Sequence, residues 1–192
     1  MATDGFPGAI WIPAHTDRWS RRDSRTVDEI VLHITEGGTD NAEITAHNAF
    51  GGPRYLQGGV WMEQAAHYIV GRNGTVVQCV RHKDVAFHAE GANEWTIGIE
   101  HNTRSSKNNR DTKLTAAQYL KSAELVLWLC RMLGFAPDRY HISGHSEVDP
   151  GTTHSSCPNR VLNWDLYMAA LSDQQEIAQG RTPMRLWNDD EI

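Results

Sequence analysis

Apolar residues in much of the chain come in short runs, some of them alternating with polar residues, which is the pattern of β-strands. The four clearest runs span residues 27–34, 67–70, 75–80 and 96–100. The second and third runs are separated by Gly71-Arg72-Asn73-Gly74, whose Asn-Gly pair favours a tight turn. We therefore predict a β-hairpin over residues 67–80 and two further strands.

A helical period governs the apolar positions from Leu120 to Leu133. This segment follows the capping box Thr115-Ala116-Ala117-Gln118 and precedes Gly134, a residue type that commonly ends helices. Two shorter helices are predicted, one over residues 40–50 with Thr39 or Asp40 as its N-cap and one over residues 163–171. Interleaved strands and helices predict an α/β fold, a single domain with a central mixed β-sheet flanked by helices.

The length of 192 residues fits one domain with one hydrophobic core. The sequence has no internal repeat and no Pro, Gly or Ser linker long enough to divide the chain. Its two ends differ from the middle, because the first is rich in Trp and Arg without clear periodicity and the last is polar. We predict an N-terminal arm at residues 1–26, a folded domain at residues 27–171 and a polar C-terminal tail at residues 172–192.

The charge balance argues against two classes of partner. A net charge of −6 and a pI near 5.9 leave no basic footprint, so we expect neither nucleic acid nor an anionic membrane as a partner. The sequence has no run of eighteen apolar residues, and its N-terminus lacks a basic region followed by a hydrophobic one. We therefore expect no export signal in the chain as given. We also expect a monomer.

Two histidines and a cysteine lie at strand ends and in adjoining loops, where sites are usually built. His33 ends the first strand-like run, His145 follows Gly144 late in the chain, and Cys157 lies in a polar loop before Pro158. Histidine nitrogen and cysteine thiolate are ligands that Zn²⁺ prefers, and three protein ligands leave a coordination position for water or substrate. The pattern predicts a catalytic Zn²⁺ site.

Other interpretations of these residues stay open. With ten histidines and three cysteines in the chain, each candidate taken alone can be a packing or surface residue. His154 or His141 can also supply a fourth protein ligand, which would make the metal structural. The other cysteines, Cys79 and Cys130, lie in apolar segments and are expected to be core thiols rather than disulfide partners.

Five short motifs follow one another along the chain. They are Val31-Leu32-His33-Ile34-Thr35, Ala66-His67-Tyr68-Ile69-Val70 with Arg72-Asn73-Gly74-Thr75-Val76, Ala86-Phe87-His88-Ala89, Ile97-Gly98-Ile99-Glu100, and Gly144-His145-Ser146-Glu147-Val148 with Cys157-Pro158. With these motifs the chain resembles the type 2 zinc-dependent N-acetylmuramoyl-L-alanine amidases, which include phage lysozyme-type amidases and share their fold with peptidoglycan-recognition proteins. The resemblance implies that residues 27–171 form a catalytic domain of this kind.

The resemblance also implies roles for particular residues. It implies that His33, His145 and Cys157 hold Zn²⁺, with Cys157 at a place where other members have Asp. It implies that Glu100 orients or deprotonates the attacking water, which suits a carboxylate acting as general base. A surface ion pair at a strand end is the alternative for Glu100.

Two positions depart from the family pattern. Ala66 stands where some members have Tyr, and Ser155 stands where many have a Lys or Thr that steadies the oxyanion. His154 or Ser155 is the candidate replacement for that donor, and a loop histidine facing water is the alternative for His154.

Three further residues are candidates for substrate binding. His88 and Phe87 resemble the Trp-His-Ala segment that lines the groove of family members, so the resemblance implies that they contact substrate. For His67, a substrate contact and a structural hydrogen bond carry equal weight.

The residues themselves suggest metal-assisted amide hydrolysis, and the resemblance implies that the bond is the amide between N-acetylmuramic acid and L-alanine in bacterial peptidoglycan or muropeptides. A noncatalytic peptidoglycan-binding module of the same fold is the alternative, because fold alone does not determine function. A phage endolysin released by lysis, a delivered antibacterial effector and a cytoplasmic recycling enzyme all fit a chain without an export signal. We favour the endolysin, made in the cytoplasm and acting on the wall.

Overall fold

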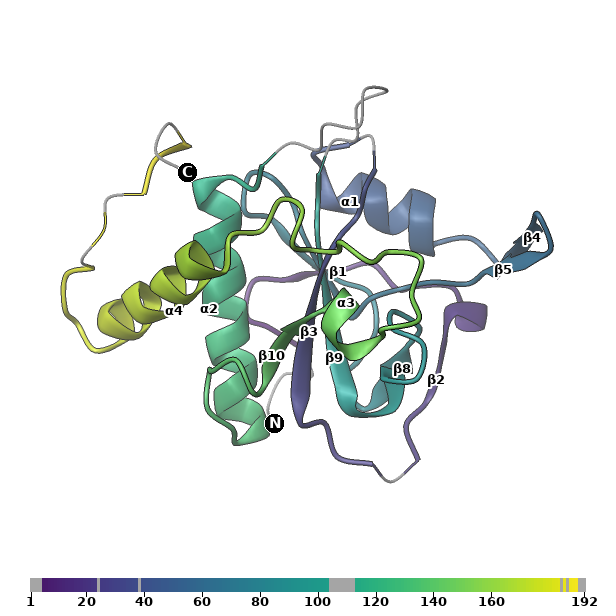
Figure 1. The fold of residues 1–192 in the computed structure, drawn as a ribbon, viewed down its shortest axis with the longest axis horizontal. Helices are drawn as coiled ribbons and strands as arrows, with labels where there is room; N and C mark the ends of the chain where they lie inside the picture. The colour runs from purple at the N-terminus through teal and green to yellow at the C-terminus, as the bar shows by residue number, and fades with distance from the viewer. Residues whose placement is uncertain are drawn as a thin grey trace.

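The computed structural model describes residues 5–23, 25–37, 39–103, 113–183, 185 and 187–189. A six-stranded sheet of order β1-β7-β6-β9-β3-β10 lies at its centre (Figure 1). Its strands are β1 Ile10–Trp11, β3 Glu29–Ile34, β6 Tyr68–Val70, β7 Val76–Gln78, β9 Thr96–His101 and β10 Ile142–Gly144. β10, β3, β9 and β6 are parallel, whereas β6 and β7 form an antiparallel pair. The sheet is therefore mixed, and the predicted α/β fold with flanking helices is confirmed.

Helices cover both faces of this sheet. α2 (Ala116–Leu133) and α4 (Trp164–Ala178) lie side by side and pack on one face (Figure 1). α1 (Ala42–Thr45) continues into the π-helical turn η2 (Ala46–Phe50), whose apolar residues belong to a second core cluster. In β3, Ile30 and Leu32 pack in the cluster of α2 and α4. Because side chains alternate along a strand, His33 lies on the opposite face.

Local signals account for α2 and the hairpin. Thr115 caps α2 and forms the predicted capping box with Gln118, and Gly134 ends the helix with φ 84°. The strands β6 and β7 are joined by a turn in which Gly74 has φ 83°. Both predictions are confirmed, as are the strands β3 and β9.

Two predicted helix ends were wrong. The N-cap of α1 is Asn41 rather than Thr39 or Asp40, because the Asn41 side chain accepts hydrogen bonds from the backbone N–H groups of Glu43 and Ile44. α4 runs beyond residue 171 to Ala178. A polar residue in this extension, Asp173, is buried and accepts a hydrogen bond from Trp187 Nε1 at 2.8 Å.

Part of the segment predicted as an arm, residues 1–26, belongs to the sheets. β1 pairs with β7 at the edge of the main sheet, and β2 (Trp19–Arg21) pairs with β8 (Asp84–Ala86). These strands are two and three residues long, too short for a detectable period. Between them lies the 3-10 turn η1 (Thr16–Arg18), and η3 (Asn93–Trp95) precedes β9. The domain boundaries themselves stay predictions.

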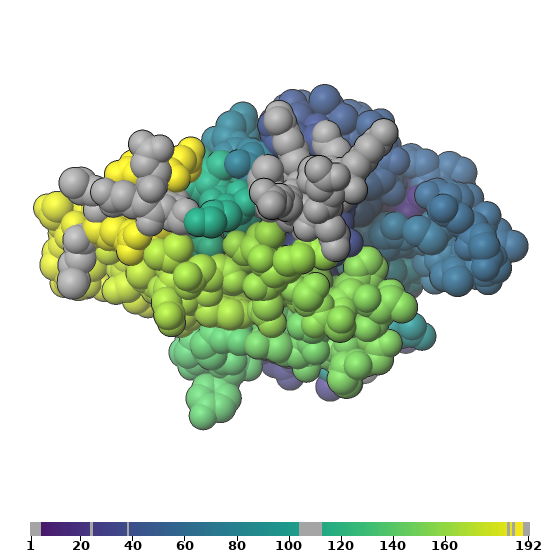
Figure 2. Space-filling model, turned by 45° about the horizontal axis from the view of Figure 1, so that its top comes forward, coloured from purple at the N-terminus to yellow at the C-terminus, as the bar shows by residue number. Residues whose placement is uncertain are grey.

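A small hairpin stands apart from the main sheet. β4 (Tyr55–Gln57) and β5 (Val60–Met62) pair with each other and protrude at the right of the molecule (Figures 1 and 2). Across the ranges that the structure describes, no helix combines the length and apolarity needed to span a membrane.

Candidate metal centre

Parallel strands bring the candidate residues together at one edge of the sheet. His33 of β3 pairs in register with Glu100 of β9, and Gly144 of β10 pairs with Leu32 of β3. His145 begins the short helix α3 (His145–Val148) directly after β10. Because the carboxyl ends of parallel strands meet at the same edge, these side chains from distant parts of the chain converge there.

Cys157 reaches this edge from a loop. The Ser146 N–H donates to the Cys157 carbonyl at 3.0 Å, and the Ile34 N–H donates to Cys157 Sγ at 3.4 Å. A Cβ on Gly144 would lie 2.6 Å from Pro158 Cδ, so the loop can pack here only against a glycine. The loop is therefore held against both β3 and the start of α3.

The three candidate ligands fit a metal ion. One ligand atom each from His33, His145 and Cys157 lies within 4.8 Å of the others, and all three residues are buried. Two histidine nitrogens and a cysteine sulfur are a donor set suited to Zn²⁺. Burial and the nearby Glu100 raise the pKa of the Cys157 thiol to about 12, so the thiol keeps its proton near neutral pH until a cation replaces it.

Glu100 has the environment of a functional carboxylate. Its Oε2 is buried and has no hydrogen-bond partner among the described residues. Burial raises the pKa of Glu100 to about 8, and the negative charge of Glu36 contributes in the same direction. A surface ion pair, the alternative considered for this residue, does not match a buried oxygen without a partner.

The loop before Cys157 places His154 beside the cluster. The His154 ring lies 5.8 Å from the ring of His145 with an interplanar angle of 22°, although its side chain is 54% exposed. Its Nδ1 lies 3.7 Å from Glu36 Oε2, and the other Glu36 oxygen accepts a hydrogen bond from Arg160 at 2.7 Å. Ser155 is exposed on the same loop. His154 thus lies closer to the centre than a loop histidine that faces only water.

Two residues that support the ligands were not found from the sequence. Asp149 Oδ2 lies 3.5 Å from His145 Nε2, and His101 Nδ1 donates to the carbonyl oxygen of His33 at 2.8 Å. A partner on a ring nitrogen, as Asp149 is for His145, orients the ring and selects its tautomer, whereas the bond from His101 holds the backbone of His33. The spacing of four residues between His145 and Asp149 was the available signal, since residues i and i+4 face each other on a helical turn.

The three residues predicted to contact substrate differ in burial and in hydrogen bonding. His67 is fully buried, with Nδ1 accepting from the Gly98 N–H at 3.1 Å and Nε2 lying 3.2 Å from the Asp84 carbonyl oxygen. Its ring nitrogens are both used, which matches the structural hydrogen bond rather than the substrate contact. His88 is also buried and contacts His33, whereas Phe87 is half-buried.

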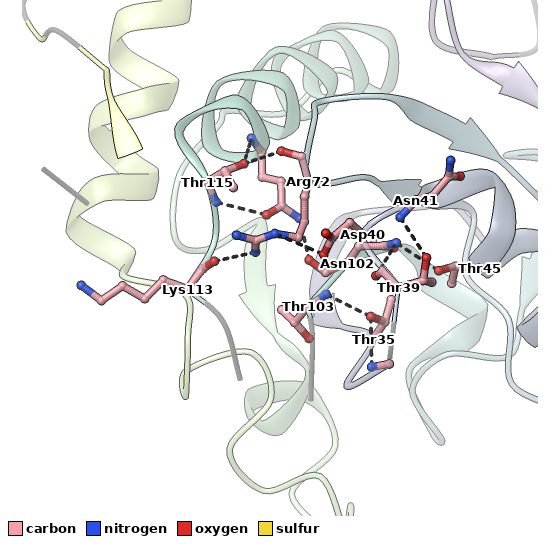
Figure 3. A network of polar contacts seen from close by, with 12 residues as sticks. Thr35, Thr39, Asp40, Asn41, Thr45, Arg72, Asn102, Thr103, Lys113 and Thr115 are labelled. Carbon is pink, nitrogen blue, oxygen red and sulfur yellow. Dashed lines mark hydrogen bonds and ion pairs between the residues drawn. The ribbon is translucent and has the colours of Figure 1, made fainter. Parts of the chain in front are cut away.

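A polar network holds the chain segments just beyond the ends of β3 and β9 (Figure 3). The Thr103 N–H donates to Thr35 Oγ1 at 3.2 Å, and Asn102 Nδ2 donates to Thr45 Oγ1 at 3.0 Å. Arg72 of the hairpin turn donates to the Lys113 carbonyl oxygen at 2.8 Å, ahead of α2. Hydrogen bonds therefore tie together the backbone segments that follow the strands carrying His33 and Glu100.

We expect the metal-free chain to lose stability below about pH 6.5. Burial lowers the pKa of His67, of His88 to about 3 and of His101 to about 4, so unfolding takes up a proton at each ring. Each contributes a loss of about 1.4 kcal/mol per pH unit until its folded-state pKa is reached. Glu100 offsets part of this, because its raised pKa makes the folded state bind a proton. Urea unfolding with a chelator at pH 7.5 and pH 5.5 measures the effect, and equal stabilities would contradict it.

A buried His-His-Cys cluster beside a carboxylate, at the carboxyl ends of parallel strands, is typical of a metal-dependent hydrolase. Residues 23–160 match the N-acetylmuramoyl-L-alanine amidase family. The chain belongs to this family, as its motifs predicted. The matched range includes all three candidate ligands and Glu100.

Two relatives are similar in sequence. N-acetylmuramoyl-L-alanine amidase A of Achromobacter lyticus is 25% identical over 179 residues, covering 84% of this chain and 92% of the relative. The 1,6-anhydro-N-acetylmuramyl-L-alanine amidase AmpD of Haemophilus influenzae is 28% identical over 119 residues, covering 57% of this chain and 60% of the relative.

Solved structures have the same fold. A selenomethionine derivative of AmpD superposes with a TM-score of 0.67 at 19% identity, covering 88% of this chain and 97% of that one. An endolysin of a Thermus scotoductus bacteriophage superposes with a TM-score of 0.56 at 20% identity, covering 79% and 89%. The amidase fold predicted from the sequence is thereby confirmed.

Proposed function

We propose that this chain hydrolyses the amide bond between N-acetylmuramic acid and L-alanine in peptidoglycan. The observation that carries the proposal is the convergence of His33, His145 and Cys157 beside the buried Oε2 of Glu100 in a chain of the amidase family. A binding module needs neither a three-ligand cluster nor a carboxylate with a pKa near 8.

We infer that the resident metal is Zn²⁺, held by the two imidazoles and the thiolate. When bound, it supplies a Lewis acid and makes a water molecule acidic enough to act as a nucleophile near neutral pH. His33 and His145 bind as neutral rings, and burial favours this form by lowering the pKa of both. Cys157 gives up its proton on binding, so metal uptake releases a proton to solvent.

Glu100 is the proposed general base and acid. Its Oε2 takes the proton of the attacking water and passes it to the nitrogen of the leaving L-alanine. A group that both accepts and returns a proton works best with a pKa near the working pH. Burial raises the pKa of Glu100 to about 8 in the metal-free chain, and a cation held by the neighbouring ligands would lower it from there. The pairing of β9 with β3 at this position holds the backbone of Glu100 beside that of His33.

His154 is the proposed donor to the oxyanion that develops on the scissile carbonyl. We expect His154→Ala to lower kcat by about 10²-fold, the usual loss when one such donor is removed. Ser155→Ala, on the same exposed loop, is the matched control and should lose much less. The rate of stem-peptide release measures both, and wild-type activity in His154→Ala would remove this role.

The test of the activity is mass spectrometry of peptidoglycan after incubation with the full chain. Free stem peptides beginning with L-alanine are expected, and they should be absent from a sample with a zinc chelator and from the Glu100→Gln variant. Muropeptides left intact in every sample, together with co-sedimentation of protein and wall, would replace the amidase with a binding module.

We propose that the form of peptidoglycan that serves as substrate is the intact cell wall, reached after lysis or delivery. A soluble anhydro-muropeptide in the cytoplasm is the alternative. N-acetylmuramoyl-L-alanine amidase A, whose name specifies no anhydro substrate, matches 84% of this chain, and the relative named for the anhydro substrate matches 57%. Initial rates on the two substrates decide between them, and a higher kcat/KM on the anhydro-muropeptide would reverse the proposal.

A further inference from the structure

A chain of buried contacts runs from a main-chain carbonyl to His33. The Thr96 hydroxyl donates to the Ala92 carbonyl oxygen at 2.8 Å, and Thr96 Oγ1 lies 3.0 Å from His88 Nε2. His88 Nδ1 lies in turn 3.0 Å from His33 Nε2. None of the four residues is more than 8% exposed.

The chemistry of these groups sets the direction of every hydrogen bond. A carbonyl oxygen only accepts, so the single proton of the Thr96 hydroxyl is used on Ala92, and its oxygen can only accept from His88. His88 Nε2 therefore carries a proton. A histidine of ordinary pKa is largely neutral at pH 8, so its Nδ1 has a lone pair and accepts a hydrogen bond. The donor is His33 Nε2, and the Nδ1 of His33 is left without a proton.

The position of His88 is itself constrained by neighbouring residues. Asn93 Oδ1 accepts hydrogen bonds from the backbone N–H groups of His88 and Ala89, both at 2.8 Å. The ring lies over Gly98 of β9, where an added Cβ would come within 2.5 Å of His88 Cγ. A side chain at residue 98 would therefore displace the ring, so Gly98 is part of the arrangement.

We propose that Thr96 and His88 are positioning residues that hold His33 in the tautomer with its proton on Nε2, so that Nδ1 is the nitrogen available to a metal ion. The proposal rests on the proposed function only in taking His33 as a ligand. It assigns His88 to the support of this ligand, in place of the substrate contact that the family resemblance implied. Outer partners of this kind fix both the ring orientation and the tautomer of a ligating histidine.

The test uses the full chain with ¹⁵N-labelled histidine. In the metal-free protein at pH 8, two-bond ¹H–¹⁵N spectra should show His33 protonated on Nε2 alone. Thr96→Val keeps the shape of the side chain and removes the hydroxyl, so His88 loses its selected tautomer and His33 should show a mixture. Thr96→Ser restores the hydroxyl and should restore the single tautomer.

Zinc affinity, measured by competition with a chromogenic chelator, gives the second readout. Thr96→Val should bind about 10–100-fold more weakly than wild type, as is usual when an outer partner of a ligand is lost. Thr96→Ser should bind nearly as tightly as wild type. If Thr96→Val does not fold, Gly98→Ala tests the same proposal, because it displaces the His88 ring and should give the same mixture of tautomers.

The possible failures are distinguishable. A proton on Nδ1 of His33 in wild type would contradict the proposal that Thr96 and His88 hold the tautomer of His33. A Thr96→Val variant with an unchanged tautomer and unchanged zinc affinity would contradict it as well. If the tautomers are as expected but neither wild type nor any variant binds zinc, the positioning roles of Thr96 and His88 are upheld. The proposal that His33, His145 and Cys157 hold Zn²⁺ is then contradicted instead.

Discussion

Replacement of Cys157 by serine is expected to remove bound metal and almost all amidase activity. In the proposed site the thiolate is the anionic ligand of the three, and a serine hydroxyl, which stays protonated near neutral pH, does not replace it. The loss should exceed the roughly 10–100-fold caused by losing an outer partner of a ligand. Metal content by atomic emission and the rate of stem-peptide release measure the two effects.

The matched control is Cys157→Asp, since the family resemblance places Asp at this position in other members. A carboxylate restores an anionic oxygen ligand, and we expect metal content and part of the activity to return. Both variants keep the contact between the Ser146 N–H and the carbonyl of residue 157, because that contact is made by the backbone. A serine variant with full metal content and activity would show that Cys157 is not a ligand.

The Glu100→Gln variant is expected to keep its metal and lose activity by about 10²–10⁴-fold, the usual contribution of a positioned general acid–base group. Glutamine has nearly the same size and cannot take up the proton of the attacking water. Steady-state rates on purified muropeptide, with metal content as the parallel measurement, give the result. Glu124→Gln removes a partly exposed carboxylate from α2 and serves as the control that should keep wild-type activity.

Stability separates a chemical loss in Glu100→Gln from misfolding. The pKa of Glu100 is raised from 4.5 to about 8 in the folded chain, so its contribution to stability is fully present below about pH 4.5 and is lost as the pH rises through 8. Glutamine carries no charge to bury. The metal-free variant should therefore be at least as stable as metal-free wild type at pH 8.5, and lower stability would point to disrupted packing.

The parts of the fold with strong local signals could be predicted from the sequence. The capping box at Thr115 and the glycine at residue 134 delimit α2 through interactions within a few residues of each end. The Asn-Gly turn likewise defines the hairpin without reference to the rest of the chain. The end of α4 could not be predicted in this way, because Asp173 is polar in sequence, whereas in the fold it is buried and accepts a hydrogen bond from the distant Trp187.

The sequence by itself determined the α/β class, the helix and hairpin with local caps and turns, and the residue types of the candidate metal centre. Those properties depend on neighbours along the chain and on the chemistry of each side chain. The tertiary structure decided that residues 33, 100, 145 and 157 meet, because their proximity depends on the register of β3 with β9 and β10 and on the packing of Pro158 against Gly144. The tertiary structure also decided the proposed positioning role of His88, because its two ring nitrogens contact His33 and Thr96, which are distant along the chain. The direction of the hydrogen bonds from Thr96 through His88 to His33 depends on these contacts, which the spacing of the residues along the chain does not predict.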